Sequence, residues 1–284
     1  MKDRIPKLIA ADLDGTLLTS DKHVTEKTAG VLRGIHERFG TEIVPATGRM
    51  LTGIPEDVWK IGCIRYAVTE NGAEIHDTEK GEPLYQCGIP CVAAAELTAF
   101  LDTLPVLYDC YIGGRAYMPE RFFRDAGTYI LNRSLLEMIR TRWIAVDDLT
   151  ERILKNGTDV MKIQCYIKER DEAERAAVRR KIAERFPEIS ISSTASFHLE
   201  IGNKDAGKGR ALETLSGMLG IGREDTMAFG DGDNDRSLLK AAGKGVAMRG
   251  ADAGLLRAAD DVTRFCSDED GVAAYLEETL DLRV

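Results

Sequence analysis

Short apolar runs alternate with helical patterns near both ends of the chain, and this alternation restricts the fold more than any other feature. The run Lys7–Ala11 suits a strand buried on both faces, and it ends at aspartates. Thr25 can cap the helix that follows, and Gly40 is placed to end it. The pattern predicts a parallel sheet covered by helices, which is a doubly wound, Rossmann-like α/β core.

The same alternation continues along the chain and returns near its C-terminal end. Further strands of the core are predicted at four apolar runs: Glu42–Ala46, Tyr66–Thr69, Met227–Phe229 and Val246–Met248. Helices are predicted at Ile54–Ile61 and from starts near three residues: Lys208, Asp235 and Ala251. Both ends of the chain therefore contribute to one core.

The middle of the chain has a different character. A hairpin is predicted at Val106–Met118 around Gly113-Gly114, and a charged helix is predicted from Glu172 to Phe186. Such a mixture of hairpins and helices indicates an α+β cap domain. We predict that residues 84–191 form this cap, inserted into a core made of residues 1–83 and 192–284.

Composition narrows the classes of function. The formal net charge of −9 repels polyanions and gives no broad binding surface for nucleic acid or anionic lipid. No apolar run approaches the roughly 20 residues that span a bilayer, and the N-terminal segment lacks a signal peptide's apolar stretch. The six cysteines form no CxxC pair, which favours a reducing compartment. We expect a cytoplasmic protein without a nucleic-acid, membrane or obligate protein partner.

Two acidic clusters stand where strands are expected to end. Asp12 and Asp14 are two residues apart, so both carboxylates can point to one space above the sheet, and Gly15 lets the chain bend after them. The second cluster, GDGDND from Gly230 to Asp235, follows an apolar run in the same way. Open α/β sheets bind ligands at these strand ends. A turn with two solvated acids is the alternative reading of the first cluster.

The carboxylates of these two clusters need a compensating cation. Two unit charges about 4 Å apart repel by roughly 4 kcal/mol at an effective dielectric of about 20, and hard cations prefer oxygen ligands. A calcium-binding EF-hand loop starting at Asp231 would need glycine and glutamate where the chain has Arg236 and Ala242. The sequence therefore predicts Mg2+ as the cofactor.

Two further motifs carry groups that can bind an anion. Thr47 and Gly48 follow the strand predicted to end at Ala46, and the Thr47 hydroxyl and Gly48 amide can donate to an anion. A helix N-cap is the other role open to Thr47. Lys208 lies in a stretch close to a phosphate-binding P-loop, but Gly209 stands where that loop requires Ser or Thr.

Together, the motifs DLDGT, ATGR, GKG and GDGDND occur in this order, each at a predicted strand end or helix start. This set resembles the haloacid dehalogenase superfamily of phosphatases. The resemblance extends to Asn71-Gly72 and to Asp270-Gly271-Val272. The long insertion after the third strand is similar to the Cof-type subgroup, which has a C2B-like α/β cap. The resemblance thus covers nearly the whole chain.

The resemblance implies a phosphatase that uses Mg2+ to hydrolyse small phosphomonoesters, such as sugar phosphates or related metabolites. It implies that Asp12 is the nucleophile that forms a phosphoaspartate, and that Asp14 is the general acid and base. The metal ligands would be the Asp12 carboxylate, the Asp14 carbonyl and Asp231. Asp235 would hold these ligands in place without binding the metal itself. The groups implied to bind the phosphoryl oxygens belong to Lys208, Thr47, Gly48 and Asn234.

Two alternatives remain open, and one position departs from the family pattern. A phosphomutase resembling phosphomannomutases would use the same Asp12 and Asp14 but return the phosphoryl group to its substrate. A phosphoryl-sensing module would use Asp12 as a modified switch residue. The departure is at Arg249-Gly250, where the family usually has Gly-Asn, so a polar contact near the site is expected to differ.

Overall fold

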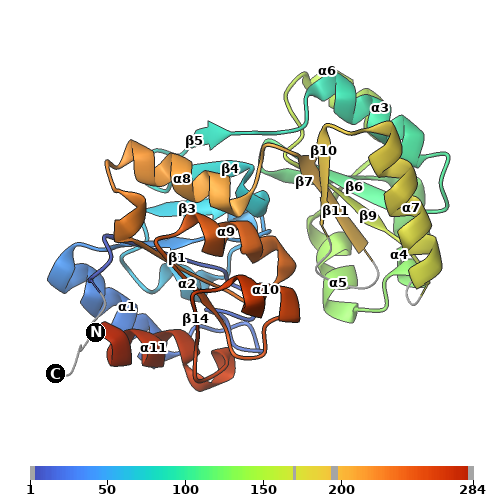
Figure 1. Cartoon of the computed structure of the whole chain (residues 1–284). Helices are drawn as coiled ribbons and strands as arrows, with labels where there is room; N and C mark the ends of the chain where they lie inside the picture. The colour runs from blue at the N-terminus through green and yellow to red at the C-terminus, as the bar shows by residue number, and fades with distance from the viewer. Residues whose placement is uncertain (1–3, 169–170, 193–197, 281–284) are drawn as a thin grey trace. The chain divides into compact units, whose positions relative to one another are not determined.

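The computed structural model describes residues 4–168, 171–192 and 198–280, with only the backbone of Ser134. The chain divides into two compact units, Met1–Gln86 with Gly207–Val284 and Cys87–Ala206 (Figure 1). The sequence places the second boundary earlier, at 191/192. The difference arises because β10 (Ile189–Ser192) pairs with β11 (His198–Asn203), which pairs in turn with the second unit's β9 (Lys162–Tyr166).

The first unit is built on a parallel sheet with the strand order β14-β13-β12-β1-β2. Its strands are β1 (Leu8–Ala11), β2 (Glu42–Pro45), β12 (Thr226–Gly230), β13 (Lys244–Ala247) and β14 (Asp261–Val262). A smaller antiparallel sheet consists of β3 (Tyr66–Thr69), β4 (Glu74–Asp77) and β5 (Pro83–Gln86). A parallel bridge between Ala46 and Val68 joins the two sheets.

Alternate residues of β1 pack into two separate cores on the two faces of the parallel sheet. The helices of this unit are α1 (Glu26–Phe39), α2 (Glu56–Trp59), α8 (Lys208–Met218), α9 (Arg236–Ala241), α10 (Ala253–Ala258) and α11 (Gly271–Leu280). Ile9 belongs to the core under α1, α2 and α11. Leu8 belongs to the core under α8, α9 and α10. The predicted doubly wound core is confirmed, because helices cover both faces of a parallel sheet.

The ends of α1 follow the sequence expectation. The Thr25 hydroxyl accepts a hydrogen bond from the Thr28 amide at the start of the helix. Gly40 has a φ of 69° and its amide donates to the His36 carbonyl at the end. A left-handed glycine at this position ends the helix and turns the chain into β2.

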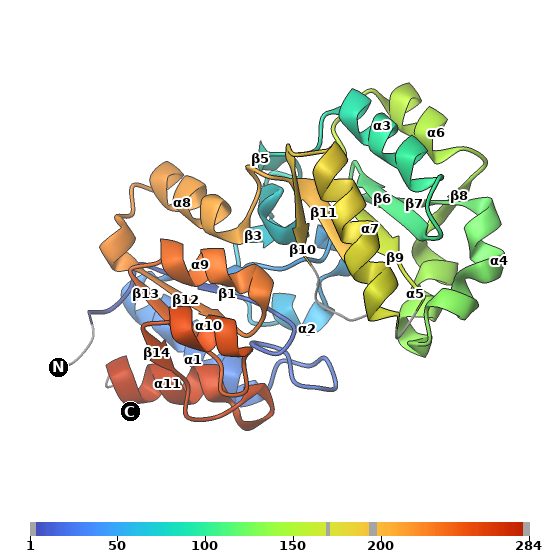
Figure 2. The same cartoon turned by 45° about the vertical axis from the view of Figure 1, so that its right-hand side comes forward.

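The second unit is an α+β domain around one mixed sheet with the strand order β10-β11-β9-β6-β7-β8 (Figure 2). Its remaining strands are β6 (Leu107–Ile112), β7 (Arg115–Pro119) and β8 (Ile144–Val146). Its helices are α3 (Cys91–Leu101), α4 (Glu120–Tyr129), α5 (Arg133–Arg142), α6 (Leu149–Asn156) and α7 (Glu172–Arg185). The predicted hairpin is present as β6 and β7, whose pairing ends at Ile112 and Arg115. Within the described part of the chain, no helix has the length and apolar character that a membrane span needs.

Candidate active site

The carboxyl ends of three adjacent strands bring the predicted motifs to one edge of the parallel sheet. β1 lies between β12 and β2. The amide of Asp12, just after β1, donates to the Phe229 carbonyl of β12 at 3.0 Å. The amide of Ala46, just after β2, donates to the Ala11 carbonyl at 2.8 Å. This register sets Thr47 beside the end of β1, at the edge where open α/β sheets bind ligands.

Lys208, the first residue of α8, joins two carboxylates that are far from it in the sequence. Its Nζ lies 2.6 Å from Oδ1 of Asp12 and 2.6 Å from Oδ1 of Asp235. The Lys208 side chain is 0% exposed, so these ion pairs are shielded from water and from salt screening. The buried ammonium thus connects the motif after β1 with the motif after β12.

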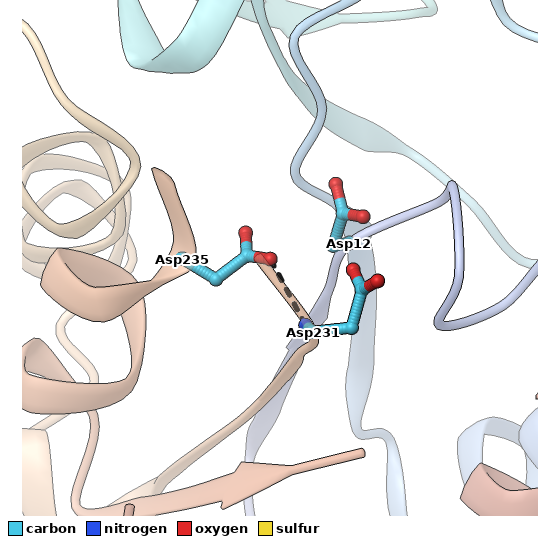
Figure 3. A group of neighbouring side chains, drawn as sticks. All are labelled: Asp12, Asp231 and Asp235. Carbon is cyan, nitrogen blue, oxygen red and sulfur yellow. Dashed lines mark hydrogen bonds between the residues drawn. The ribbon is translucent and has the colours of Figure 1, made fainter. Parts of the chain in front are cut away.

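Asp235 uses both of its carboxylate oxygens within this cluster. Oδ1 accepts from Lys208, and Oδ2 accepts from the amides of Asp231 at 3.1 Å and Gly232 at 3.0 Å. Figure 3 shows the bond to the Asp231 amide and the carboxylates of Asp12 and Asp231 beside each other. Asp235 therefore fixes Lys208 and the loop after β12 together.

Three carboxylates gather closely enough to share one cation. Asp12, Asp231 and Asp235 each offer an oxygen, and these oxygens lie within 4.8 Å of one another (Figure 3). Burial raises the pKa of Asp12 to about 8, although Lys208 opposes this shift, and burial together with Asp235 raises the pKa of Asp231 to about 6. Lys208 alone does not balance the negative charge. A hard cation with oxygen ligands fits this donor set.

Gly15 allows Asp231 to approach the loop after β1. Its φ is 83°, and a Cβ added at this position would lie 2.2 Å from Oδ2 of Asp231. Any side chain at position 15 would therefore clash with the carboxylate in addition to straining the backbone. The glycine of the DLDGT motif is required both by the turn and by the acidic cluster.

Asp14 makes its contacts with two cationic side chains. Arg49 donates from Nε to Oδ2 at 2.7 Å and from Nη2 to Oδ1 at 2.8 Å, and Lys22 Nζ donates to Oδ1 at 2.8 Å. Burial raises the pKa of Asp14, but Arg49 and Lys22 outweigh that effect and lower it to about 2. In this arrangement Asp14 is an ionised carboxylate.

Thr47 and Gly48 lie in a loop that is held from several sides. The next helical turn, Leu51–Gly53, is preceded by Met50, so Thr47 is not a helix cap as its alternative reading required. The Thr47 hydroxyl accepts from the Arg49 amide at 3.2 Å, and the Thr47 amide donates to the Val68 carbonyl at 2.9 Å. Its hydroxyl proton can therefore be donated to a ligand.

Asn234 is held by a residue of a different motif. Its Nδ2 donates to Oδ1 of Asn71 at 3.1 Å. Asn71 and Arg49 belong to the predicted motifs, but no sequence pattern indicated their contacts, and none pointed to Lys22. For Arg49, the available signal was its spacing two residues after Thr47.

The departure at Arg249 is accommodated on the surface. The Arg249 amide donates to Oγ1 of Thr263 at 2.9 Å. Its guanidinium lies 3.5 Å from Glu269. Gly250 follows with a φ of 91° and open space where a Cβ would be added. The described contacts of Arg249 are thus with Thr263, Arg264 and Glu269, and none is with the acidic cluster.

Comparisons with known proteins agree with this arrangement. Residues 9–276 match the family of haloacid dehalogenase-like hydrolases. The chain is 31% identical to phosphatase YwpJ of Bacillus subtilis, over 96% of this chain and 100% of that protein. It is 33% identical to the HMP-PP phosphatase of Cronobacter sakazakii, over 97% and 96%.

A solved structure shows the same fold. The haloacid dehalogenase-like hydrolase from Bacillus subtilis has a TM-score of 0.81 to this chain at 30% identity, covering 96% of this chain and 99% of that one. The match includes both compact units, since each lies almost wholly within the covered length. On its motifs, fold and relatives, the chain belongs to the haloacid dehalogenase-like hydrolases, as a Cof-type phosphatase that acts on phosphoric monoesters.

Proposed function

We propose that the chain hydrolyses small phosphomonoesters, sugar phosphates or related metabolites, with Mg2+ and through a phosphoaspartate on Asp12. The observation that carries this proposal is the buried Lys208 ammonium, 2.6 Å from both Asp12 and Asp235. A phosphate dianion repels an attacking carboxylate, so the reaction needs fixed positive charge at this point. Lys208 supplies one such charge, and the remaining carboxylates can attract another.

The reaction proceeds in two displacements at phosphorus. An oxygen of the Asp12 carboxylate attacks phosphorus, the bond to the ester oxygen breaks, and the leaving alkoxide takes a proton from Asp14. Asp14 then accepts a proton from water, which attacks phosphorus and breaks its bond to Asp12, releasing inorganic phosphate. Because Arg49 and Lys22 hold Asp14 ionised, Asp14 must leave these cations before it carries the first proton.

The metal would be held by the Asp12 carboxylate, the Asp14 carbonyl and the Asp231 carboxylate. The raised pKa values of Asp12 and Asp231 support this assignment, because both carboxylates lack full compensation for their charge. When bound, Mg2+ supplies Lewis-acid stabilisation of the phosphoryl oxygens. Asp235 contributes by fixing Lys208 and the loop amides.

Donors on two loops would orient the phosphoryl group. These are the Thr47 hydroxyl, the Gly48 amide and the Asn234 amide. Together with Lys208 they surround the end of β1 from the adjacent loops. Such fixed donors stabilise charge that develops during transfer without reorganising at each turnover.

The substrate class and location are supported by several features. YwpJ and the HMP-PP phosphatase are both named as phosphatases, and the net charge of −9 disfavours a polyanionic substrate such as nucleic acid. All six cysteines are free, as suits a reducing compartment. We therefore place the reaction on small metabolites in the cytoplasm.

The test measures inorganic phosphate released from a panel of sugar phosphates and nucleotides, with Mg2+ and with EDTA. Asp12→Asn is nearly isosteric and removes the nucleophile's charge, so it should abolish release while leaving the fold intact. Asp125→Asn, at an exposed position of α4, is the matched control and should retain activity.

Each result of this panel has a defined meaning. Release that depends on both the metal and Asp12 supports the proposal, and the best substrate begins to define the leaving group. An isomerised sugar phosphate without released phosphate would indicate the phosphomutase instead. A long-lived phosphoaspartate with little turnover would indicate the sensing module. Substantial release by Asp12→Asn would overturn the mechanism.

A further inference from the structure

A turn of left-handed backbone lies directly after β3. Glu70, Asn71 and Gly72 form the short helical turn η2 (Glu70–Gly72), with φ values of 52°, 59° and 94°. Residues other than glycine rarely adopt this conformation, because Cβ crowds the backbone. Consecutive residues in this region persist only where the surrounding structure determines them. The contacts of the turn show what determines it.

The backbone of this turn is bound to the loop that carries Thr47. The Glu70 amide donates to the Arg49 carbonyl at 3.0 Å, and the Asn71 amide donates to the Thr47 carbonyl at 3.0 Å. These bonds lie on either side of Gly48. The left-handed turn therefore determines where the Thr47 hydroxyl and the Gly48 amide are placed.

The same turn packs against the start of α8. A Cβ added at Gly72 would lie 2.2 Å from the Gly207 carbonyl carbon and 2.6 Å from the Lys208 amide nitrogen. Only glycine permits so close an approach between two backbones. The turn thus contacts both the Thr47 loop and the residue that presents the buried ammonium.

The Asn71 side chain extends this contact to a third motif. Its Oδ1 accepts from Nδ2 of Asn234 at 3.1 Å. A Cβ added at Gly48 would lie 2.8 Å from the same Oδ1. The carboxamide therefore fills the space between Gly48 and Asn234, and it leaves no room for a side chain at position 48.

We propose that Asn71 is a positioning residue for the phosphoryl group, acting through Asn234. This inference rests on the proposed function, in which the Asn234 amide binds a phosphoryl oxygen. The hydrogen bond from Asn234 to Asn71 fixes the rotation of the Asn234 amide. The left-handed backbone at Asn71 explains why a residue tolerant of this conformation occupies the position.

The decisive variant is Asn71→Gly, because glycine keeps the left-handed backbone and removes only the carboxamide. Loss of one positioning hydrogen bond should weaken the binding of inorganic phosphate by up to about tenfold. Calorimetric titration of phosphate into the Mg2+-loaded full chain measures this without requiring turnover. Asn156→Gly, at an exposed asparagine ending α6, is the matched control and should bind phosphate as the unchanged protein does.

A double-mutant cycle separates positioning from a general structural effect. Titrations are made on the unchanged chain, Asn71→Gly, Asn234→Ala and the double variant. If Asn71 acts through Asn234, Asn71→Gly weakens binding in the first background and adds little in the second. A merely structural role would weaken binding equally in both backgrounds and would lower the melting temperature.

The outcomes distinguish this inference from the proposed function. Unchanged phosphate affinity in Asn71→Gly, equal losses in both backgrounds, or no phosphate binding by the unchanged chain would each overturn the positioning role. Coupled losses support it. The release assay with Asp12→Asn is read separately, so a chain with coupled phosphate binding and no Asp12-dependent release would contradict only the mechanism.

Discussion

Both units of the molecule bury a cluster of polar side chains, but the two clusters are balanced differently. In the first unit, Asp12, Asp231 and Asp235 gather around the single ammonium of Lys208. In the second unit, Asp109 is the carboxylate of a network whose donors are neutral. Its Oδ2 accepts from the Trp143 indole at 2.8 Å and from the Tyr166 hydroxyl at 2.7 Å, and Tyr166 also contacts Gln164 at 2.9 Å.

The position of each cluster in its sheet explains this difference. Asp109 lies in β6 and Tyr166 lies in β9, and the backbone pairing of these two strands holds both residues in place. Asp12 and Asp231 follow the ends of β1 and β12, where the chain is free to turn and expose donors and acceptors. A network within strands can stabilise one fold, whereas an unbalanced cluster at strand ends can bind a cation and an anion.

The largest effect is expected from Lys208→Met. The substitution leaves Asp12 and Asp235 buried without their shared cation, which should cost about 3–5 kcal/mol of unfolding free energy. It also removes charge stabilisation at the phosphoryl group, so kcat should fall by about 10³-fold. Denaturant unfolding and the phosphate-release assay measure the two effects separately.

Lys162→Met is the matched control in the second unit. Lys162 is also buried, with its Nζ 3.3 Å from Oε1 of Glu200, so its loss should likewise reduce stability. Its kcat should stay near that of the unchanged protein, because the proposal places no chemistry there. Equal losses of kcat in both variants would mean that Lys208 acts only through the fold.

The next largest effect concerns the pH dependence of stability. Burial raises the pKa of Asp109 from 3.8 to about 6. The folded state therefore holds this proton more tightly than the unfolded state, and the stabilisation is lost as pH rises from about 4 through about 6. The loss should approach about 3 kcal/mol, since one pKa unit corresponds to about 1.4 kcal/mol. In Asp109→Asn no proton titrates, so this part of the pH dependence should vanish.

Chemical denaturation across this pH range, at constant Mg2+, checks the Asp109 prediction. The difference in unfolding free energy between Asp109→Asn and the unchanged chain should shift in favour of the variant as pH rises. Asp125→Asn, whose side chain is exposed, should show no comparable shift. A pH-independent difference for Asp109→Asn would show that the second unit's network does not carry a buried titrating carboxylate.

The contrast also explains which parts of the fold could be predicted from patterns in the sequence. Strands β1, β3 and β12 of the first unit were predicted because each is a continuous apolar run followed by turn residues. The antiparallel pairing of β3 with β4, and of β4 with β5, was not predicted. The boundary predicted at 191/192 lies earlier than the division after Ala206, because the pairing of β11 with β9 across α7 is long-range information that no local pattern carries. The apolar stretch from Phe197 to Ile201 is also typical of a strand; Phe197 lies outside the described residues, and His198 is the first described residue of β11.

In the candidate site, too, some features could be predicted from the sequence and others could not. Asp12, Asp231 and Lys208 could be assigned because each stands at a strand end or helix start in a recognisable motif. The contacts of Asp14 with Arg49 and Lys22 could not be assigned, since they depend on how two loops fold toward each other. The contact of Asn71 could not be assigned either, because its partner Asn234 lies 163 residues further along the chain. The motifs identify which chemical groups are present, whereas the tertiary structure determines which hydrogen-bond partners these groups have.

The smallest effect is expected from alanine substitution at two glycines with left-handed backbone, one in each unit. Gly113, in the β6–β7 turn, has a φ of 56° and open space where a Cβ would be added, so Gly113→Ala should cost only the backbone strain of about 1 kcal/mol. Gly15→Ala should cost a similar strain and, because its Cβ would meet Asp231 at 2.2 Å, should also displace a proposed metal ligand. We expect the Mg2+ concentration for half-maximal phosphate release to rise about tenfold in Gly15→Ala, as loss of one ligand's placement predicts, and to stay unchanged in Gly113→Ala. Equal metal dependence in both variants would show that Asp231 does not hold the metal, and the acidic cluster would then resemble the second unit's network in serving the fold alone.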